Sequence, residues 1–227
     1  MNREKYDKLR GNVESLLEKK SSSELIKEGL RFTFPTKGRS VFLFIFLLVI
    51  FLLYHSFFIE NGDVIKNYLG LVKEINEIVI PTFAVIITGY AIFQALANGT
   101  ALITLITVDE GEKTKFEIYN KFFFGISILY LFIIVFNLLI YIIFSNVPSD
   151  WSIPFFTSKT NNTLAALLIS LYIVFIIHSL IELKSFVYNL YQCFKINATT
   201  AGIEYLKNLN EVERQRKKAL EEEEKKP

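Results

Sequence analysis

The hydrophobic residues of this chain gather in four long runs instead of alternating regularly with polar residues. The runs cover residues 41–59, 78–97, 122–144 and 164–183, and the second and fourth hold more polar residues than the other two. An α-helix needs about 20 apolar residues to cross a bilayer. The pattern therefore predicts an all-α integral membrane protein whose four transmembrane helices form a bundle.

Composition narrows the class further. Hydrophobic residues make up 52% of the 227 residues, and the mean hydropathy is +0.36. The single Cys excludes an intrachain disulfide and a Cys-based zinc site. The net charge of +2 gives no case for nucleic-acid binding, which needs a basic surface.

The distribution of Lys and Arg predicts the orientation in the membrane. Residues 1–40, 98–121 and 184–227 hold 22 of the 25 basic residues, whereas 60–77 and 145–163 hold the other three. Loops rich in Lys and Arg stay on the cytoplasmic side. We therefore expect a multi-pass protein of the cell inner membrane with both termini in the cytoplasm.

The segments beside the spans also carry helical patterns. Residues 1–40 form a cytoplasmic amphipathic segment, in which Ser21 and Glu24 make an S-x-x-E capping box. Residues 60–77 keep helical spacing and are expected to form an amphipathic helix on the outer surface that runs into the second span. The remaining connections are a cytoplasmic loop at 98–121 and an outer loop at 145–163.

The charged tail at 184–227 permits two interpretations. Ile203, Leu206, Leu209 and Val212 form an apolar stripe among many charges. The tail is either a solvated charged helix or a helix that docks a cytosolic protein partner or other copies of the chain.

Small residues in and after the second span predict a packing face. Ala91, Ala95 and Gly99 recur every four residues, and small side chains let helices approach closely in lipid. The face packs either within the chain or between copies of a homo-oligomer.

Four polar residues in the spans are candidate functional groups: Gln94, Asn137, His178 and Glu182. Such groups either hydrogen-bond between helices or line a water-filled path. His178 and Glu182 lie one helical turn apart and have the chemistry to relay protons or hold a cation. Glu182 also precedes Lys184, so the alternative is a carboxylate at the headgroup level that snorkels or pairs.

The sequence contains no catalytic motif that we recognise. The G-x-S-x-G, H-E-x-x-H and Walker-type patterns are all missing. We therefore expect no enzymatic activity, no cofactor and no metal.

In its architecture, the chain resembles small multi-span membrane proteins of prokaryotic antiviral defence systems, including retron-associated and Kiwa-type proteins. The basic amphipathic first segment, the Phe- and Ile-rich spans at 41–59 and 122–144, and the charged tail at 211–226 carry this resemblance. It implies either membrane disruption during infection or membrane-based sensing that engages a cytosolic nuclease or toxin.

Three functions are therefore considered. The first is an effector that oligomerises and permeabilises the membrane on a cytosolic signal. The sequence slightly favours this function, because the second and fourth spans are more polar than an anchor requires. The second is a non-conducting anchor or sensor that recruits a cytosolic partner. The third is a small transporter, which is the weakest because the spans show no internal repeat.

Overall fold

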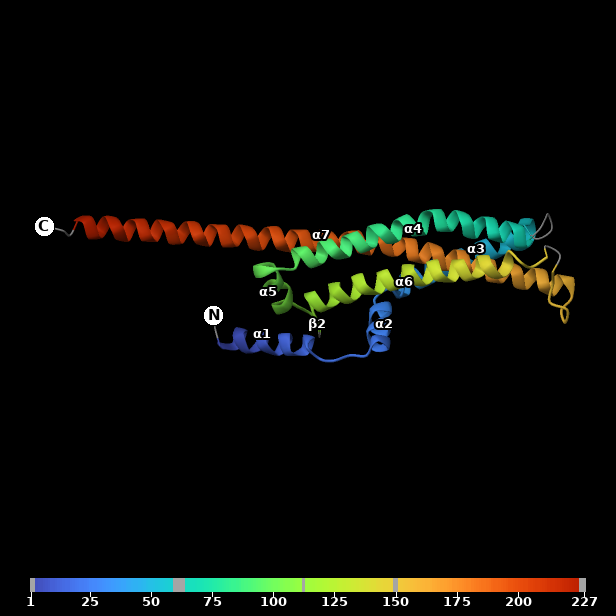
Figure 1. Ribbon diagram of the computed structural model, residues 1–227, viewed down its shortest axis with the longest axis horizontal. Coiled ribbons are helices and arrows are strands. Elements are labelled where there is room, and N and C mark those ends of the chain that lie inside the picture. Colours follow the sequence, from blue (N-terminus) through green and yellow to red (C-terminus); the bar gives the residue numbers. More distant parts are fainter. Residues whose placement is uncertain (1–2, 59–63, 112, 149–150, 225–227) are drawn as a thin grey trace. The chain divides into compact units, whose positions relative to one another are not determined.

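The structure is a computed structural model that describes residues 3–58, 64–111, 113–148 and 151–224 (Figure 1). Over these residues the protein is all-α apart from one two-stranded hairpin. The elements are α1 (Arg3–Leu16), α2 (Ser22–Arg31), α3 (Lys37–Leu53), the π-helical turn η1 (Tyr54–Phe58), α4 (Val64–Leu96), α5 (Gly99–Thr107), β1 (Asp109–Glu110), β2 (Lys113–Thr114), α6 (Lys115–Phe144) and α7 (Ser158–Glu224).

Four helices are long and apolar enough to cross a membrane, which confirms the predicted number of candidate spans. They cover Lys37–Ser56, Val64–Leu96, Lys115–Phe144 and Ser158–Lys218. Three of them are at least seven residues longer than the corresponding apolar runs. A helix continues into polar sequence because its backbone hydrogen bonds do not depend on apolar side chains. α4 joins the amphipathic segment to the second run with Pro81 inside the helix, and α7 joins the fourth run to the charged tail.

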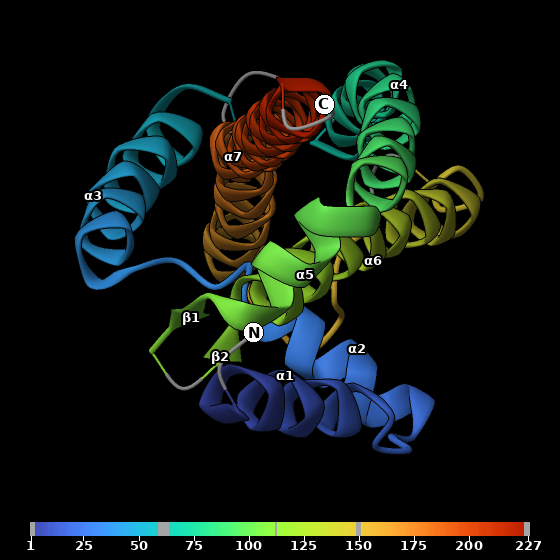
Figure 2. The ribbon, with the colours of Figure 1, turned by 90° about the vertical axis from the view of Figure 1, so that its left-hand side faces the viewer.

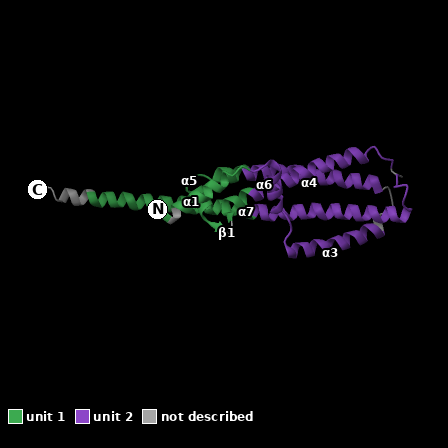
Figure 3. Cartoon of the chain, turned by 90° about the horizontal axis from the view of Figure 1, so that it is seen from below, with its two compact units in different colours: residues 1–19, 91–120, 188–227 green, residues 20–90, 121–187 purple. Residues whose placement is uncertain are grey.

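The chain divides into two compact units, shown in green and purple in Figure 3. Unit 1 consists of residues 1–19, 91–120 and 188–227, and unit 2 consists of residues 20–90 and 121–187. Each unit is described by itself below.

In unit 1 the cytoplasmic loop predicted at 98–121 has a structure of its own. It contains α5, the β1–β2 hairpin and the start of α6. Asn12 of α1 donates from Nδ2 to the Ile106 carbonyl oxygen at 2.7 Å, and Lys8 forms an ion pair with Asp109 at 2.6 Å. The amphipathic first helix therefore packs against this connection.

The core of unit 2 lies among three helices. Fully or nearly fully buried side chains come from α4 (Val79, Ile86), α6 (Phe123, Ile133) and α7 (Ala166), among others. In Figures 2 and 3, α7 lies between α3 on one side and α4 with α6 on the other. Only Leu43 is buried in α3, so this helix exposes its apolar side chains as a lipid-facing span does.

The short helix α2 docks on α6 through two glycines. The predicted capping box is confirmed, because the Ser21 hydroxyl accepts from the Glu24 N–H and the Glu24 carboxylate accepts from the Ser21 N–H. A Cβ atom added at Gly29 would lie 3.1 Å from the Gly125 Cα atom, and one added at Gly125 would overlap the Gly29 carbonyl oxygen. Only glycine allows this backbone contact.

An ion pair also joins α2 to α6. Glu28 of α2 forms ion pairs with Lys20, at 2.8 Å, and with Lys121 of α6. The hydrogen bonds from Lys121 and then from Lys20 lower the pKa of Glu28 from 4.5 to about 2.

Gly125→Ala is expected to destabilise the protein by roughly 1–3 kcal/mol, because its methyl group overlaps the α2 backbone. The matched control is Gly70→Ala in α4, where an added Cβ meets nothing within 4 Å. There the substitution should leave stability unchanged or raise it by up to about 1 kcal/mol. Thermal unfolding in detergent, followed by circular dichroism, measures both. Equal effects of the two substitutions would contradict the Gly29–Gly125 contact.

The Glu28 ion pairs predict a pH dependence. A lowered folded-state pKa stabilises the protein fully above pH 4.5, and this contribution is lost as the pH falls towards 2. The stability difference between the wild type and Glu28→Gln should therefore be constant at neutral pH and shrink between pH 4.5 and 2. Because Glu28 is partly exposed, high salt should reduce the difference. A difference that does not change with pH would contradict the role of these pairs.

Candidate functional site

Asn137 is fully buried and links three helices. Its Nδ2 donates to Asn76 Oδ1 of α4 at 2.7 Å, and its Oδ1 accepts from the Tyr172 hydroxyl of α7 at 2.9 Å. We call Asn76, Asn137 and Tyr172 the polar triad. Of these three residues, only Asn137 is a candidate from the sequence. Asn76 lies in the segment expected on the outer surface, and Tyr172 is one of several aromatic residues in its span.

A second buried bond joins α6 to α7. The Tyr130 hydroxyl donates to the Ser179 carbonyl oxygen at 3.1 Å, and both residues are buried. The Ser179 carbonyl oxygen lies within a helix, so it accepts from the Tyr130 hydroxyl with its second lone pair. Neither residue was a candidate from sequence, because nothing in the local pattern marks one tyrosine among 11.

Glu182 is buried, with 2% of its side chain exposed, and forms an ion pair with Arg39 at the start of α3. The second terminal nitrogen of Arg39 donates to Ser185 Oγ at 3.1 Å. A buried carboxylate is stable when it is paired and hydrogen-bonded. Of the roles considered for Glu182, the structure thus has the paired one, with a partner that lies 143 residues away in sequence.

His178 binds the segment just before α3. Its Nε2 lies 2.9 Å from the carbonyl oxygen of buried Thr33, so Nε2 carries the proton in this contact. Its Nδ1 is buried and has no hydrogen-bond partner in the part of the chain that the structure describes. His178 therefore binds Thr33, in the connection between α2 and α3, and Glu182 binds Arg39, in the first turn of α3. Among the described residues there is no cluster of three His, Cys, Asp or Glu for a metal ion.

Gln94 belongs to unit 1 and joins α4 to α6. Its Nε2 donates to Asn120 Oδ1 at 3.0 Å. Asn120 was not a candidate, because it falls in the segment expected to be a loop.

The stripe of small residues is interrupted, which corrects one expectation. Ala91 and Ala95 are exposed on α4, but α4 ends at Leu96 and Gly99 begins α5. Asn98 is extended, with φ −131° and ψ 167°, and Gly99 has φ +47°, a conformation that glycine adopts readily. Gly99 therefore does not continue the helical face of Ala91 and Ala95.

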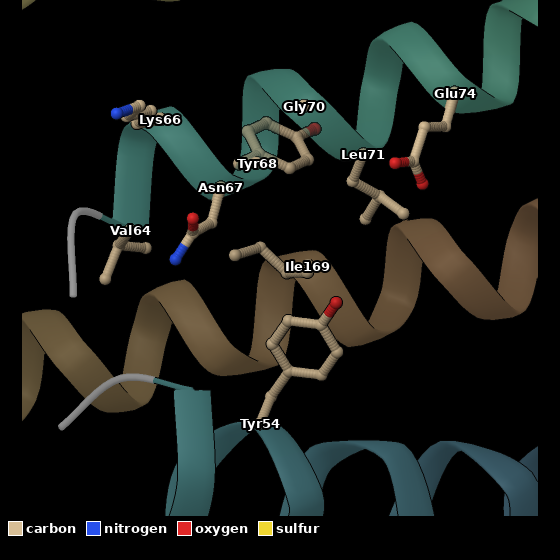
Figure 4. A pocket seen from close by; sticks show the side chains of 9 residues that line it. All are labelled: Tyr54, Val64, Lys66, Asn67, Tyr68, Gly70, Leu71, Glu74 and Ile169. Atoms are coloured by element: carbon tan, nitrogen blue, oxygen red, sulfur yellow. The ribbon is translucent and has the colours of Figure 1, made fainter. Parts of the chain in front are cut away.

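Two cavities lie next to the polar triad. The smaller, of about 440 Å³, lies where the first turns of α4 face α7 and η1 (Figure 4). The hydroxyl of Tyr54, the amide of Asn67 and the carboxylate of Glu74 point towards it, above an apolar floor that includes Leu71 and Ile169.

The larger cavity is a groove of about 1080 Å³ between α6 and α7. Its described lining comes from the first turns of α4, from α6 between residues 132 and 144, from residues 151–156 and from α7 between residues 158 and 175. None of these lining residues is Asp, Glu, Lys, Arg or His. The ring of Tyr172 lines the groove, so the triad and the groove share a side chain.

No protein-family model, curated protein or solved structure matches this chain. The function is therefore inferred from the chain's own geometry. In that geometry, three of the four candidate polar residues, Gln94, Asn137 and Glu182, bind a side chain of another helix.

A double-mutant cycle tests the polar triad. Tyr172→Phe and Asn137→Ala should show a coupling free energy of about 0.6 kcal/mol and at most about 1.7 kcal/mol, the range for hydrogen bonds between membrane helices. Unfolding in detergent measures each variant. In the control cycle, Tyr172→Phe is combined with Ser127→Ala, because buried Ser127 donates only within α6, to the Phe123 carbonyl oxygen. Similar coupling in the two cycles would contradict a direct bond between Tyr172 and Asn137.

Proposed function

We propose that this protein is a non-conducting membrane anchor or sensor, a four-helix bundle of the cell inner membrane that recruits a cytosolic partner. In this proposal both termini are cytoplasmic, and the charged end of α7 is the recruiting element. The resemblance to membrane proteins of antiviral defence systems supports a role in such a system, with a nuclease or toxin as the partner.

The observation that carries the proposal is the pairing of polar groups within the chain. Asn137, Glu182 and Gln94 each bind a side chain of another helix. A conducting path needs polar groups that are free to replace the water around an ion. Groups that are already paired with their neighbours serve better to hold helices together.

The distribution of charge supports the orientation. Both termini and the connection at 98–121 hold 22 of the 25 basic residues. Basic segments stay on the cytoplasmic side, so the proposal places these three segments there. Unit 1 brings α1, α5 and the last part of α7 together from these same segments.

The end of α7 supports recruitment. α7 is one uninterrupted helix from Ser158 to Glu224, and every residue from 201 to 218 is exposed. Ile203, Leu206, Leu209 and Val212 are 43% to 60% exposed, although they are apolar. A helix that leaves such side chains in water gains stability when a partner covers them.

An oligomeric effector that permeabilises the membrane is the second candidate. It is favoured by one observation, which is that Ala91 and Ala95 are exposed on α4 and so remain available to pack against another copy.

Inducible expression in a bacterium, with membrane potential, uptake of an impermeant dye and affinity capture measured in the same cells, distinguishes the two candidates. We expect an intact potential, together with a reproducible cytosolic partner. Replacing both Leu206 and Leu209 by Ser should abolish capture of that partner, since this removes two exposed apolar side chains. The matched control replaces Asn208 and Glu211, which are exposed polar residues of the same turns, by Ser.

Two results would contradict the anchor. The first is rapid depolarisation at modest expression that is lost in an Ala91→Leu, Ala95→Leu variant, which would favour the oligomeric effector. The second is equal capture by the Leu and control variants, which would remove the end of α7 as the recruiting element.

A further inference from the structure

We propose that the groove between α6 and α7 binds an acyl chain of a membrane phospholipid as a specific ligand. The proposal does not depend on the anchor function, because it concerns unit 2 alone. It starts from the groove's volume of about 1080 Å³, at the upper end of the usual range for small-molecule sites.

The length of the groove fits one leaflet. Along α7 its lining runs from Ser158 to Phe175, which at the helical rise is about 26 Å. Along α6 it runs from Phe132 to Phe144, or about 18 Å. One leaflet contributes about 15 Å of hydrocarbon, so a phospholipid chain from that leaflet fits along the groove.

Polar and apolar lining residues are separated along the groove. The Ser and Asn side chains are Ser152, Ser158, Asn161 and Asn162, all at the end where the α6–α7 connection enters α7. Deeper lining residues are aliphatic or aromatic. A phospholipid has polar and apolar parts in the same order. Its ester oxygens accept hydrogen bonds at one end of each acyl chain, and the rest of that chain is hydrocarbon.

The described lining residues carry no charge, which favours a phospholipid over a free fatty acid as the source of the acyl chain. A free fatty acid would bring a carboxylate, which needs a cation or several donors when it leaves water. A phospholipid keeps its charged headgroup in the aqueous layer and inserts only its ester and hydrocarbon parts. A groove whose described lining carries no charge therefore fits the phospholipid better.

The shape of the groove favours a flexible chain over a helix of another protein. Its floor contains buried Ile140, Ile169 and Tyr172, whereas Leu139 and Leu168 on its walls are about half exposed. Eight of the 23 lining residues that the structure describes are aromatic, and Ala165 is the only Gly or Ala among these 23. Close packing of membrane helices needs small residues on the contact face. A hydrocarbon chain instead fits between bulky rings.

The walls are held in place by the protein's own contacts. Asn161 accepts from the Ile153 N–H and donates to the Ile153 carbonyl oxygen, both at 3.2 Å, so it fixes the connection against α7. Tyr68 makes edge contacts with Phe144 and Tyr172, with ring centroids 5.7 and 5.6 Å apart. A groove formed in advance loses little conformational entropy when it binds.

Photolabelling tests the proposal on the full chain. The protein is reconstituted in phosphatidylcholine vesicles that contain a phosphatidylcholine with a diazirine on one acyl chain, and labelled residues are mapped by mass spectrometry. We expect labelling to concentrate on groove residues such as Phe136 and Leu168, about tenfold above Leu48 of α3, which is 47% exposed. A tenfold preference corresponds to about 1.4 kcal/mol of binding free energy.

A pair of Leu→Trp substitutions provides the control. Leu168→Trp narrows the groove and should lower labelling of Phe136 by about tenfold. Leu131→Trp, at a residue of α6 that is 45% exposed but does not line the groove, should leave that labelling unchanged. Circular dichroism checks that both variants fold. If Leu168→Trp does not, Ala165→Leu replaces it.

Three results would overturn the proposal. Equal labelling of the groove and of α3 means that lipid only surrounds the protein. Crosslinks from the groove to a second copy mean that a helix occupies it. Competition by added palmitate, but not by unlabelled phosphatidylcholine, means that the ligand is a free fatty acid.

Discussion

The hydrocarbon core of a membrane offers no hydrogen-bond partner, so each polar side chain of the spans depends on another part of the same chain. α7 supplies three partners for other helices, Tyr172, Ser179 and Glu182, which lie within about 80° of one another around its axis. A rotation of α7 by one residue, about 100°, would break all three contacts together. The rotational position of α7 in unit 2 is therefore fixed by polar contacts, and apolar packing follows from it.

Contacts with α7 and α6 hold the segment from α2 to the start of α3. His178 binds Thr33, Glu182 binds Arg39, and Gly29 of α2 packs on Gly125 of α6. A buried ion pair adds little net stability, but losing one partner leaves a charge without compensation. The pair therefore acts as a positional constraint on α3, which has only one buried side chain of its own.

Sequence was sufficient for features that are local. Apolar runs identified four candidate spans, and the S-x-x-E pattern identified the cap of α2, because each depends on neighbouring residues. Partners such as Asn76 for Asn137 and Arg39 for Glu182 are 61 and 143 residues apart, and helix rotation decides them. The prediction for Gly99 was wrong. Its regular spacing from Ala91 and Ala95 suggested one helical face, but α4 ends at Leu96 and the extended Asn98 separates it from α5.

The polar triad and the groove meet at Tyr172, whose ring forms the floor of the groove while its hydroxyl binds Asn137. In the structure, one rotamer of Tyr172 both lines the groove and reaches Asn137, which in turn binds Asn76 of α4. An occupant therefore stabilises the arrangement of α4, α6 and α7 to the extent that it prefers this rotamer. The polar triad is thus linked to the groove through a single aromatic side chain.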